Sequence, residues 1–517
     1  MNAMRPIIDH AMTPSDTSDS FARISPSEFF YRNRQMAGFG NQVQAVYSTV
    51  RELVENSLDA CEDIGTLPRI QVELNEDETG TLTIVVSDNG SGVPADQVAD
   101  AFGTVFYGSK YNLRQRRGTF GLGVTMAVLY GQVTTNSPVE IHTRTSCGSG
   151  ERFRILIDIE NNRPIIEDRA PAVRDTTGTT VNIRLKGDLK RARDRVLEYL
   201  RLTTVGTPHA EIQASIAGQT IVFGPWCRTV PPKTVPTKPH PRAADLELLR
   251  RLISKSRSET RLRDFLVSSF QQLGNQTASR LLAFLSLDGS RRIETLSRDE
   301  LIVLSKALKT FDGVLPPSSD GLSPIGEESF LNSVAAVLDC RPLGYACSSV
   351  RDWEGYPFIV EGVLAIGAGT SDLDFPLLYR FANRVPLLYD AAECVLTRVN
   401  RGLGWSRYST GLTGNPILAV HVCSTRIPYK EAGKQSIAPV AEIESALIAL
   451  YRSLGRRLKT TARGMVQSTW ESKRMRELSR EMRLIARFAM ELTDGTEDSS
   501  DIDSLVNALF EVKEDGR

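Results

Sequence analysis

The sequence lacks several features that would place it in a narrow class at once. Lys and Arg together number 62, as do Asp and Glu, so the chain carries no formal net charge. A nucleic-acid coat protein is usually more basic, so any DNA contact has to come from local patches. No apolar run approaches the roughly 18 residues of a membrane span, and MNAMRPIIDH has no apolar core typical of a secretion signal. We therefore expect a soluble, cytoplasmic protein.

Cysteine and histidine are sparse and show no ligand spacing. None of the seven cysteines forms a C-x-x-C pair, which argues against a zinc site and fits thiols in a reducing compartment. The cysteines are Cys61, Cys147, Cys227, Cys340, Cys347, Cys394 and Cys423. The five histidines offer no phosphoacceptor on a dimerisation helix, so a histidine kinase is not favoured.

An unusual helix is predicted around RELVENSLDA, residues 51–60. Apolar residues recur at helical spacing on one side of it, and Glu52, Asn56 and Asp59 fall almost opposite at i, i+4, i+7. Such a face is usually solvated, but solvated faces normally mix in Lys and Arg. This face offers only oxygen-rich groups, which also suit a hard cation.

Three further elements follow in order. Residues 70–86 alternate as two half-buried strands of a hairpin, and the second strand runs into DNGSG, with Asp88, Gly90 and Gly92. RRGTFGLGVTMAVLY then places glycines in GxxGxG spacing before an apolar helix, where backbone N–H groups can approach a phosphate. TTGTTVNIRL brings Thr179 into a strand. No Rossmann pattern of strand, glycines and distal acid is present.

In this order the four elements resemble the nucleotide site of the ATPase superfamily of gyrase, MutL, the large heat-shock chaperone and sensor histidine kinases. Other segments resemble more narrowly the B-type component of type IIB topoisomerases, the ATPase half of topoisomerase VI. They include FYGSKYN, PPSSDGLSPIGEE, LYRFANRVPLLYD and HVCSTRIPYKEAGKQSIA. The resemblance runs from about residue 25 to 438.

The resemblance implies an α+β chain: a Bergerat-type ATPase α/β sandwich, a small helix-two-turn-helix module, and an α/β transducer domain ending in a long stalk helix. The expected segments are an N-terminal arm (1–30), the ATP-binding domain (31–230), linker and module (231–315), transducer (316–470), and stalk end with acidic tail (471–517). Pro-rich stretches at 223–245 and 316–326 mark the linkers.

The resemblance also implies roles for particular residues. Glu52 is the expected base, Asn56 the Mg²⁺ ligand, Asp88 the acceptor for the adenine amino group, with Thr179 positioning Asp88 through a water, and Lys434 the γ-phosphate sensor. Glu55 is the rival base, although a surface acid is the simpler interpretation, and Asp59 is expected to hold the helix to the lid. The remaining nucleotide-binding candidates are Gly90, Gly92, Ser109, Lys110, Gly118, Thr119, Phe120, Gly121, Leu122, Gly123 and Val124.

The sequence departs from the family in two motifs. The lid reads Gly-Thr-Phe-Gly-Leu-Gly where the family usually has Gly-Gln-Gln-Gly-x-Gly, which puts side-chain lid contacts in doubt. Trp405, Arg407 and Tyr408 stand where the family has Trp-Lys-x-Tyr, so either a DNA role or core packing is open. Asp372 and Asp374 read as a loop, and no tyrosine stands out as a DNA-cleaving nucleophile.

We therefore predict an ATP-operated gate subunit that dimerises on ATP and Mg²⁺, captures double-stranded DNA, and works with a separate A-type cleaving subunit as an A2B2 complex. The alternative is a nucleotide-controlled scaffold for a DNA-breaking recombination protein. Its distinguishing feature would be assembly without ATP-dependent strand passage.

Overall fold

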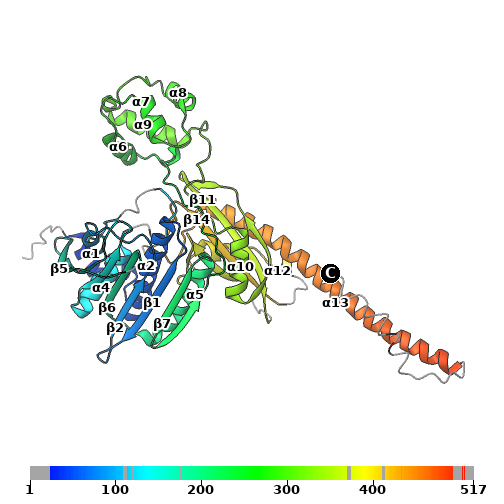
Figure 1. Ribbon diagram of the computed structural model, residues 1–517. Helices are drawn as coiled ribbons and strands as arrows, with labels where there is room; N and C mark the ends of the chain where they lie inside the picture. Colours follow the sequence, from blue (N-terminus) through cyan, green and yellow to red (C-terminus); the bar gives the residue numbers. More distant parts are fainter. Residues whose placement is uncertain are drawn as a thin grey trace, which may run out of the picture.

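The computed structural model describes residues 24–108, 113–118, 121–174, 176–369, 374–409, 414–431, 433–492, 504 and 506. Figure 1 shows two adjoining α/β bodies, a small helical module standing apart above them, and one long helix that projects away. The architecture is the expected α+β class. The expected Ser109, Lys110, Thr119, Phe120 and Asp372, most of the arm (1–23) and most of the tail (493–517) lie outside the described residues.

An eight-stranded sheet forms the first body, in the order β5-β4-β3-β6-β2-β1-β7-β8. The strands are β1 (Arg69–Glu76), β2 (Thr81–Ser87), β3 (Val139–Arg144), β4 (Glu151–Asp158), β5 (Arg163–Pro171), β6 (Gly178–Lys186), β7 (Glu211–Ile216) and β8 (Gln219–Phe223). The predicted hairpin is β1 and β2, paired antiparallel from Gln71 opposite Ser87 to Glu76 opposite Leu82. Its alternating apolar residues are buried, because one face of the sheet is covered.

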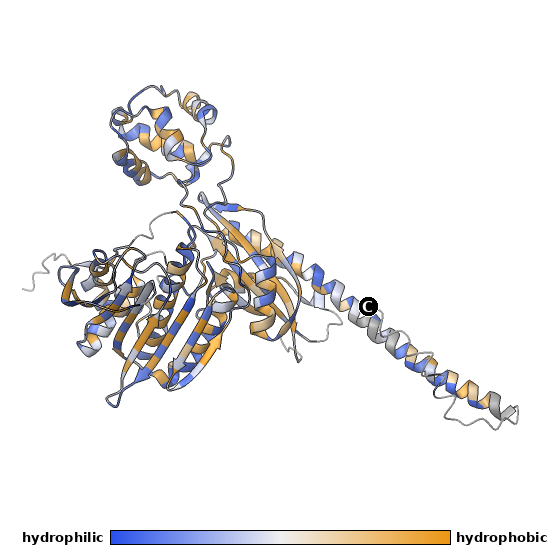
Figure 2. Cartoon of the chain, viewed as in Figure 1, coloured by the Kyte–Doolittle hydropathy of each residue, from blue (hydrophilic) through white to orange (hydrophobic). Residues whose placement is uncertain are grey.

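Helices cover that face. They are α1 (Pro26–Arg32), α2 (Gln42–Asp63), α3 (Val98–Gly103), α4 (Gly123–Thr135) and α5 (Leu189–Gly206), with a 3-10 turn η1 (Arg34–Ala37). The apolar stripe of α2 enters the core, where Val50, Val54 and Leu58 are fully buried. Figure 2 shows apolar residues gathered between these helices and the sheet. Because this stripe is buried, the opposite face of α2, with Glu52, Asn56 and Asp59, is the one available for a functional site.

Residues 24–32 pack on their own chain rather than reaching away from it. Ser25 caps α1 by accepting from the Glu28 N–H, and the Ser25 and Ser27 hydroxyls donate to the Ile159 carbonyl. Phe30 is buried. Residues 24–32 therefore pack on the first body in this structure.

The small module has a core of its own. It contains η2 (Pro241–Ala243), α6 (Leu246–Lys255), α7 (Leu262–Ser269), α8 (Asn275–Phe284), η3 (Ile293–Thr295) and α9 (Arg298–Thr310). Phe265, Leu281 and Leu304 are fully buried within it. Its helices α6 to α9 stand apart from the other bodies in Figure 1, whereas η2 touches the second body through the ion pair of Arg242 with Asp352 at 2.9 Å.

The second body is a mixed sheet in the order β10-β11-β14-β12-β13, with β9 also paired to β11. Its elements are α10 (Glu327–Leu338), β9 (Cys340–Cys347), β10 (Arg351–Trp353), β11 (Tyr356–Gly367), β12 (Leu377–Ala382), β13 (Val385–Pro386), α11 (Val395–Gly402), α12 (Ser406–Ser409), β14 (Asn415–Ser424) and α13 (Ala441–Leu492). β11 is buried almost throughout because α10 and α5 cover one side and α13 the other.

The predicted long helix is α13, which has 52 residues and, at 1.5 Å per residue, a length of about 78 Å. Its early turns are buried on the sheet through Ile443, Leu447, Leu450, Leu454 and Leu458. Farther along, large apolar side chains are exposed: Trp470, Leu478, Met482, Leu484, Ile485 and Phe488. The distal part projects as a stalk (Figure 1). No helix among the described residues is both long and apolar enough to span a bilayer.

The Trp-Ser-Arg-Tyr segment belongs to the core of the second body. Trp405 is 2% exposed, its indole N–H donates to the Asn400 carbonyl, and its ring contacts those of Tyr408 and Tyr451. The Arg407 guanidinium donates to the Leu403 and Gly404 carbonyls. This packing favours the structural interpretation of the motif over a DNA role.

Trp405→Ala should destabilise the second body by about 3–5 kcal/mol, the usual effect of truncating a buried large aromatic residue. Trp470→Ala, at a position 58% exposed, is the matched control and should change stability by less than about 0.5 kcal/mol. Thermal unfolding of both variants checks this. Equal midpoints for the two would show that Trp405 is not a core residue.

Candidate functional site

A cavity of about 550 Å³ opens between α2, the end of β2 and the start of α4. Most of the predicted residues line it: Glu52, Asn56, Asp88, Gly92, Gly118, Gly121, Leu122, Gly123, Val124, Thr179 and Lys434. Asp59 also lines it, whereas Gly90 lies behind Asp88 against α2. The residues come from segments almost 400 positions apart, because Lys434 belongs to the second body.

Asp88 stands at one end of the cavity in a fixed orientation. Its Oδ1 accepts from the N–H groups of Gly90 at 2.9 Å and Thr179 at 3.1 Å, and its Oδ2 accepts from the Ser57 hydroxyl at 2.9 Å. Burial raises the pKa of the Asp88 carboxyl, although these three hydrogen bonds oppose the shift. The Thr179 backbone thus holds Asp88 directly, where the sequence suggested a water. An acceptor fixed in this way can recognise an amino group on a base edge.

Gly178 allows β6 to approach Asp88 closely enough for these bonds. Its φ is +131°, and a Cβ there would lie 2.1 Å from the Asp88 carbonyl oxygen. The Arg174 guanidinium donates to that same oxygen. Glycine is required here both for the backbone conformation and for the space.

Glu52 and Asn56 stand toward the other end, beneath the start of α4. Glu52 is 7% exposed, and its Oε2 would lie 1.7 Å from a Cβ added to Gly123. Gly123 is the first residue of α4, whose N-terminal N–H groups carry partial positive charge. Glu52 therefore lies where an anionic group of a ligand would meet the lid helix.

Lys434 enters this end from the second body and forms a buried ion cluster. Its Nζ lies 2.8 Å from Glu55 Oε2 and 3.5 Å from Glu52 Oε2. Arg51 completes the cluster, with Nη2 2.6 Å from Glu52 Oε1 and Nη1 donating to the Gly433 carbonyl at 2.7 Å. Burial alone would lower the pKa of Lys434, but the carboxylates of Glu52 and Glu55 raise it.

Glu55 is not the surface acid that the simpler interpretation suggested. Its side chain is 1% exposed and paired with Lys434 and, at 3.5 Å, with Arg51. The periodicity of α2 places it away from the cavity lining, but it could not reveal that another body covers that side. Glu55 therefore belongs to the contact between the two bodies.

Asp59 holds α2 to the base of the lid, as expected. Arg117, immediately before Gly118, donates to Asp59 Oδ1 at 3.0 Å and to both carboxylate oxygens of Glu62. Burial lowers the pKa of the Arg117 guanidinium, but Glu62 and Asp59 more than offset this and raise it. The sequence analysis missed Arg51, Ser57 and Arg117. An arginine next to the glycine lid and facing an acidic helix was the available signal for Arg117.

The residues present fit a divalent cation only if a ligand completes its coordination. Among the described residues, no group of three or more His, Cys, Asp or Glu side chains is arranged to hold a metal ion. Asn56 presents an amide group in the cavity, and Mg²⁺ typically binds one or two protein oxygens together with phosphates and waters. A Mg²⁺ ion held by Asn56 would therefore need further oxygen ligands from a nucleotide and from water.

Comparison with known proteins shows the family to which the chain belongs. A profile described as histidine kinase-, DNA gyrase B-, and HSP90-like ATPase matches residues 41–161, and one described as topoisomerase VI B subunit, transducer, matches 317–474. The chain is 40% identical over 453 residues to the B subunit of type 2 DNA topoisomerase 6 from Metallosphaera sedula, covering 86% of this chain and 85% of that protein. The protein of the same name from Pyrobaculum aerophilum is 36% identical over 445 residues, covering 85% and 84%. The B subunit of DNA gyrase from Myxococcus xanthus aligns in structure at 11% identity with a TM-score of 0.42, covering 84% of this chain and 98% of that one.

Gly123→Ala should displace the Glu52 carboxylate, because the new Cβ would occupy its position while a rotation of the side chain relieves the clash. ATP turnover should fall by about 10²-fold, the effect that a displacement of about 1 Å can have on a reacting group. Steady-state hydrolysis measures it. Gly402→Ala, where nothing lies within 4 Å of the added Cβ, is the control. Unchanged turnover in Gly123→Ala would mean that the position of Glu52 does not matter.

Proposed function

Since the chain belongs to the family of DNA topoisomerase VI B subunits, we propose that the cavity between α2, β2 and α4 is the ATP site with which this protein operates the DNA gate. The chain is the ATPase component of an ATP-dependent type II DNA topoisomerase. The observation that supports this site best is the meeting of Glu52 and Lys434, from different bodies, at the end of the cavity opposite Asp88.

Asp88 selects the base in this proposal. The three donors around its carboxylate leave it able to accept from the adenine amino group. Guanine presents an oxygen at the corresponding position, and this oxygen could not donate a hydrogen bond to the Asp88 carboxylate. The glycines from Gly118 to Gly123 form the lid over the phosphates, and backbone N–H groups make most of that contact.

Glu52 acts as general base toward the attacking water. It lines the cavity, whereas Glu55 is sealed behind Lys434. Both Arg51 and Lys434 lie against Glu52. Transfer of Lys434 to a γ-phosphate would release one oxygen of the Glu52 carboxylate for the attacking water. The same movement would therefore sense ATP and free the base.

Asn56 is the proposed ligand of Mg²⁺. When bound, the metal would neutralise developing phosphate charge. The residue itself contributes orientation, because it lies on the same face of α2 as Glu52, one turn farther along. An Asn56→Ala variant would leave the base in place but remove this ligand.

Family membership and the shape of the chain support the rest of this proposal. We propose an ATP-dependent homodimer that encloses double-stranded DNA, with A-type cleaving subunits docked to the two stalks as an A2B2 complex in the cytoplasm. The proposed segments are 31–230 for ATP binding, 231–315 for linker and helical module, 316–470 for the transducer and 471–517 for docking. The exposed apolar residues of distal α13 support the docking role.

Glu52→Gln should abolish most turnover and retain ATP binding, because removing a general base commonly costs about 10²–10⁴-fold in rate. Glu55→Gln is the matched variant of the rival acid and should retain turnover within about tenfold, the equivalent of roughly 1.4 kcal/mol. Hydrolysis and nucleotide titration on the same preparations separate binding from chemistry. The reverse ranking of the two variants would transfer the base role to Glu55.

Truncation after Met465 should abolish the complex with the cleaving subunit and spare ATP-driven dimerisation. The early turns of α13 that pack on the transducer remain, while the exposed distal turns are lost. Full-length chain alone should hydrolyse ATP without relaxing supercoiled DNA, and should relax it together with the cognate cleaving subunit. Complex formation and DNA breakage without ATP-dependent relaxation would favour the recombination scaffold instead.

A further inference from the structure

Charged side chains of the second body contact α2 at two separate points, besides the ring contact of Tyr389 with Tyr47. The first is the ion cluster of Lys434 with Glu52 and Glu55. The second is Arg384, whose Nη1 lies 3.1 Å from Glu62 Oε1 near the end of α2. Glu55 and Glu62 are seven residues apart, which is about 10 Å along a helix. Only the first point lines the ATP cavity.

The second point is a hairpin turn made by Asn383 and Arg384 between β12 and β13. Ala382 pairs with Val385, so the turn has two residues, and their φ angles are +46° and +69°. Turns of this kind favour Asn followed by Gly, since both residues need positive φ. An arginine at the glycine position carries backbone strain, and strain of this kind persists where the surroundings enforce it, commonly at functional sites.

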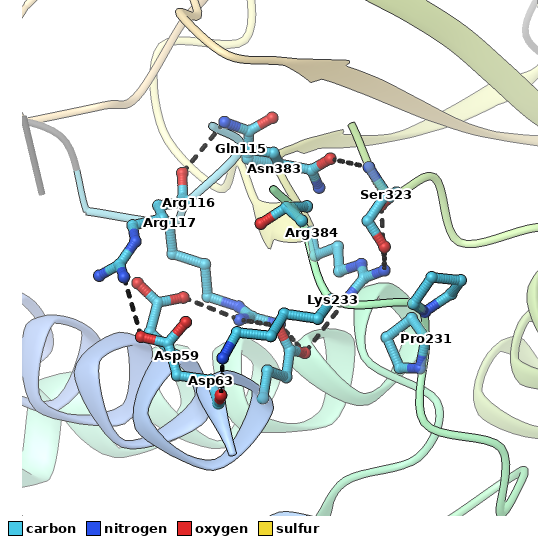
Figure 3. A pocket seen from close by; sticks show the side chains of 13 residues that line it. Asp59, Asp63, Gln115, Arg116, Arg117, Pro231, Lys233, Ser323, Asn383 and Arg384 are labelled. Atoms are coloured by element: carbon cyan, nitrogen blue, oxygen red, sulfur yellow. Dashed lines mark hydrogen bonds and ion pairs between the residues drawn. The ribbon is translucent and has the colours of Figure 1, made fainter. Parts of the chain in front are cut away.

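The Arg384 side chain connects three segments. Besides Glu62, its guanidinium contacts the Ser323 hydroxyl at 2.7 Å and the Ser323 and Pro324 carbonyls. Arg384 is 4% exposed. Figure 3 shows it beside a small cavity of about 40 Å³, with Asp59, Arg117 and Lys233 on the other walls. The α2 end, the lid base and the chain leading to α10 therefore meet at one arginine.

The turn is also fixed to the lid base and within the transducer. Asn383 Nδ2 donates to the Arg116 carbonyl at 3.0 Å, two residues before Gly118, and to the Ser424 carbonyl. The Arg384 N–H donates to His421 Nε2 at 2.9 Å. The other ring nitrogen of His421 lies 2.7 Å from the fully buried Glu361. These bonds make the turn move as one piece with β14 and β11.

The other side of the turn is packed without spare room. A Cβ on Gly206, at the end of α5, would lie 2.2 Å from the Arg384 carbonyl oxygen. The turn is therefore held between the ends of α2 and α5. It has no position in the ATP cavity, so a nucleotide cannot displace it by direct competition.

We propose that the Asn383–Arg384 turn is the pivot of the nucleotide switch. A ligand shifts a conformational equilibrium only through contacts that differ between the two states. ATP offers such a contact to Lys434 and none to the turn. The Lys434 contact would move while the Arg384 contact stays, so that the transducer rotates about the lid base rather than separating from α2. Arg384 is thus a positioning residue, and the inference rests on the ATP site proposed above.

Two native thiols allow this to be measured. Cys147 in the ATP-binding domain and Cys347 in the transducer are exposed, whereas the other five cysteines are buried or partly buried. Spin labels on this pair report the spacing of the two bodies without any added cysteine. The labelled protein is diluted with excess unlabelled protein, so that an ATP-driven dimer carries at most one labelled chain. In the unsubstituted protein, a non-hydrolysable ATP analogue with Mg²⁺ should then shift one narrow distance distribution to a second narrow one.

Arg384→Gly is the decisive variant, because glycine keeps the positive φ of the turn while removing the side chain. Its affinity for ADP should stay within about threefold of that of the unsubstituted protein, less than the tenfold that 1.4 kcal/mol represents. With the ATP analogue, the distance between the two labels should be broadly distributed. Arg384→Lys keeps the charge but cannot bridge Glu62 and Ser323, and should broaden it too. Gly206→Ala, which pushes the turn outward, should act in the same way. Arg398→Gly, at an exposed helix position outside both contacts, should retain the narrow shift.

A second narrow distance distribution in Arg384→Gly with the analogue would overturn the pivot. If the glycine variant fails to bind ADP, Arg384→Lys decides instead, and a shift like that of the unsubstituted protein would overturn the pivot. Lys434→Ala should behave differently from both, with a single narrow distribution that the analogue does not move. Absence of any shift in the unsubstituted protein would also overturn the pivot. ATP hydrolysis by that same preparation would leave the proposed function intact, so the two failures are distinguishable.

Discussion

Two carboxylates and two cations removed from water hold the nucleotide end of this molecule together. Arg51, Glu52, Glu55 and Lys434 balance one another's charge, and each is nearly fully buried. Deleting one partner from a buried ion pair costs about 3–5 kcal/mol because an uncompensated charge remains. Lys434 can therefore leave the carboxylates only if another anion receives it. In the proposed ATP site, a γ-phosphate in the adjoining cavity would be such an anion, and this condition would make the contact selective for ATP.

The two ends of the cavity differ in what they can do. At the base end, Asp88 is held by Ser57, Gly90 and Thr179, all within the first body. At the phosphate end, Lys434 comes from the second body. In the proposed site, binding of the base would need no movement between bodies, whereas recognition of the terminal phosphate by Lys434 would. ADP and ATP would then share a binding mode and still produce different arrangements of the transducer.

Sequence patterns predicted the elements whose contacts are local in the chain. The apolar stripe of α2 and the alternation in β1 and β2 reflect contacts within one element or its neighbour, so periodicity was sufficient to place Glu52, Asn56 and Asp88 correctly on their elements. Burial of Glu55 and the partnership of Arg117 with Glu62 depend on segments distant in sequence. An arginine before a glycine lid and an arginine in a hairpin turn look like ordinary surface residues until the fold brings Glu62 between them. Periodicity therefore could not show the contacts between the two bodies, which involve Glu55 and Arg384.

The interface between the bodies contains two kinds of contact with different consequences. Its centre is apolar, with Leu202 and Val205 of α5 packed against Phe330 and Val334 of α10 and against Phe381 of β12. Apolar contact is non-directional, so it favours association without specifying one orientation. Orientation is left to the polar contacts, among them the Lys434 cluster, the Arg384 turn and the bond from Arg201 Nη1 to the Val337 carbonyl. Because α13 extends about 45 Å beyond the sheet over the residues that follow the buried Ala462, a small rotation at these contacts becomes a larger displacement at the far end of α13.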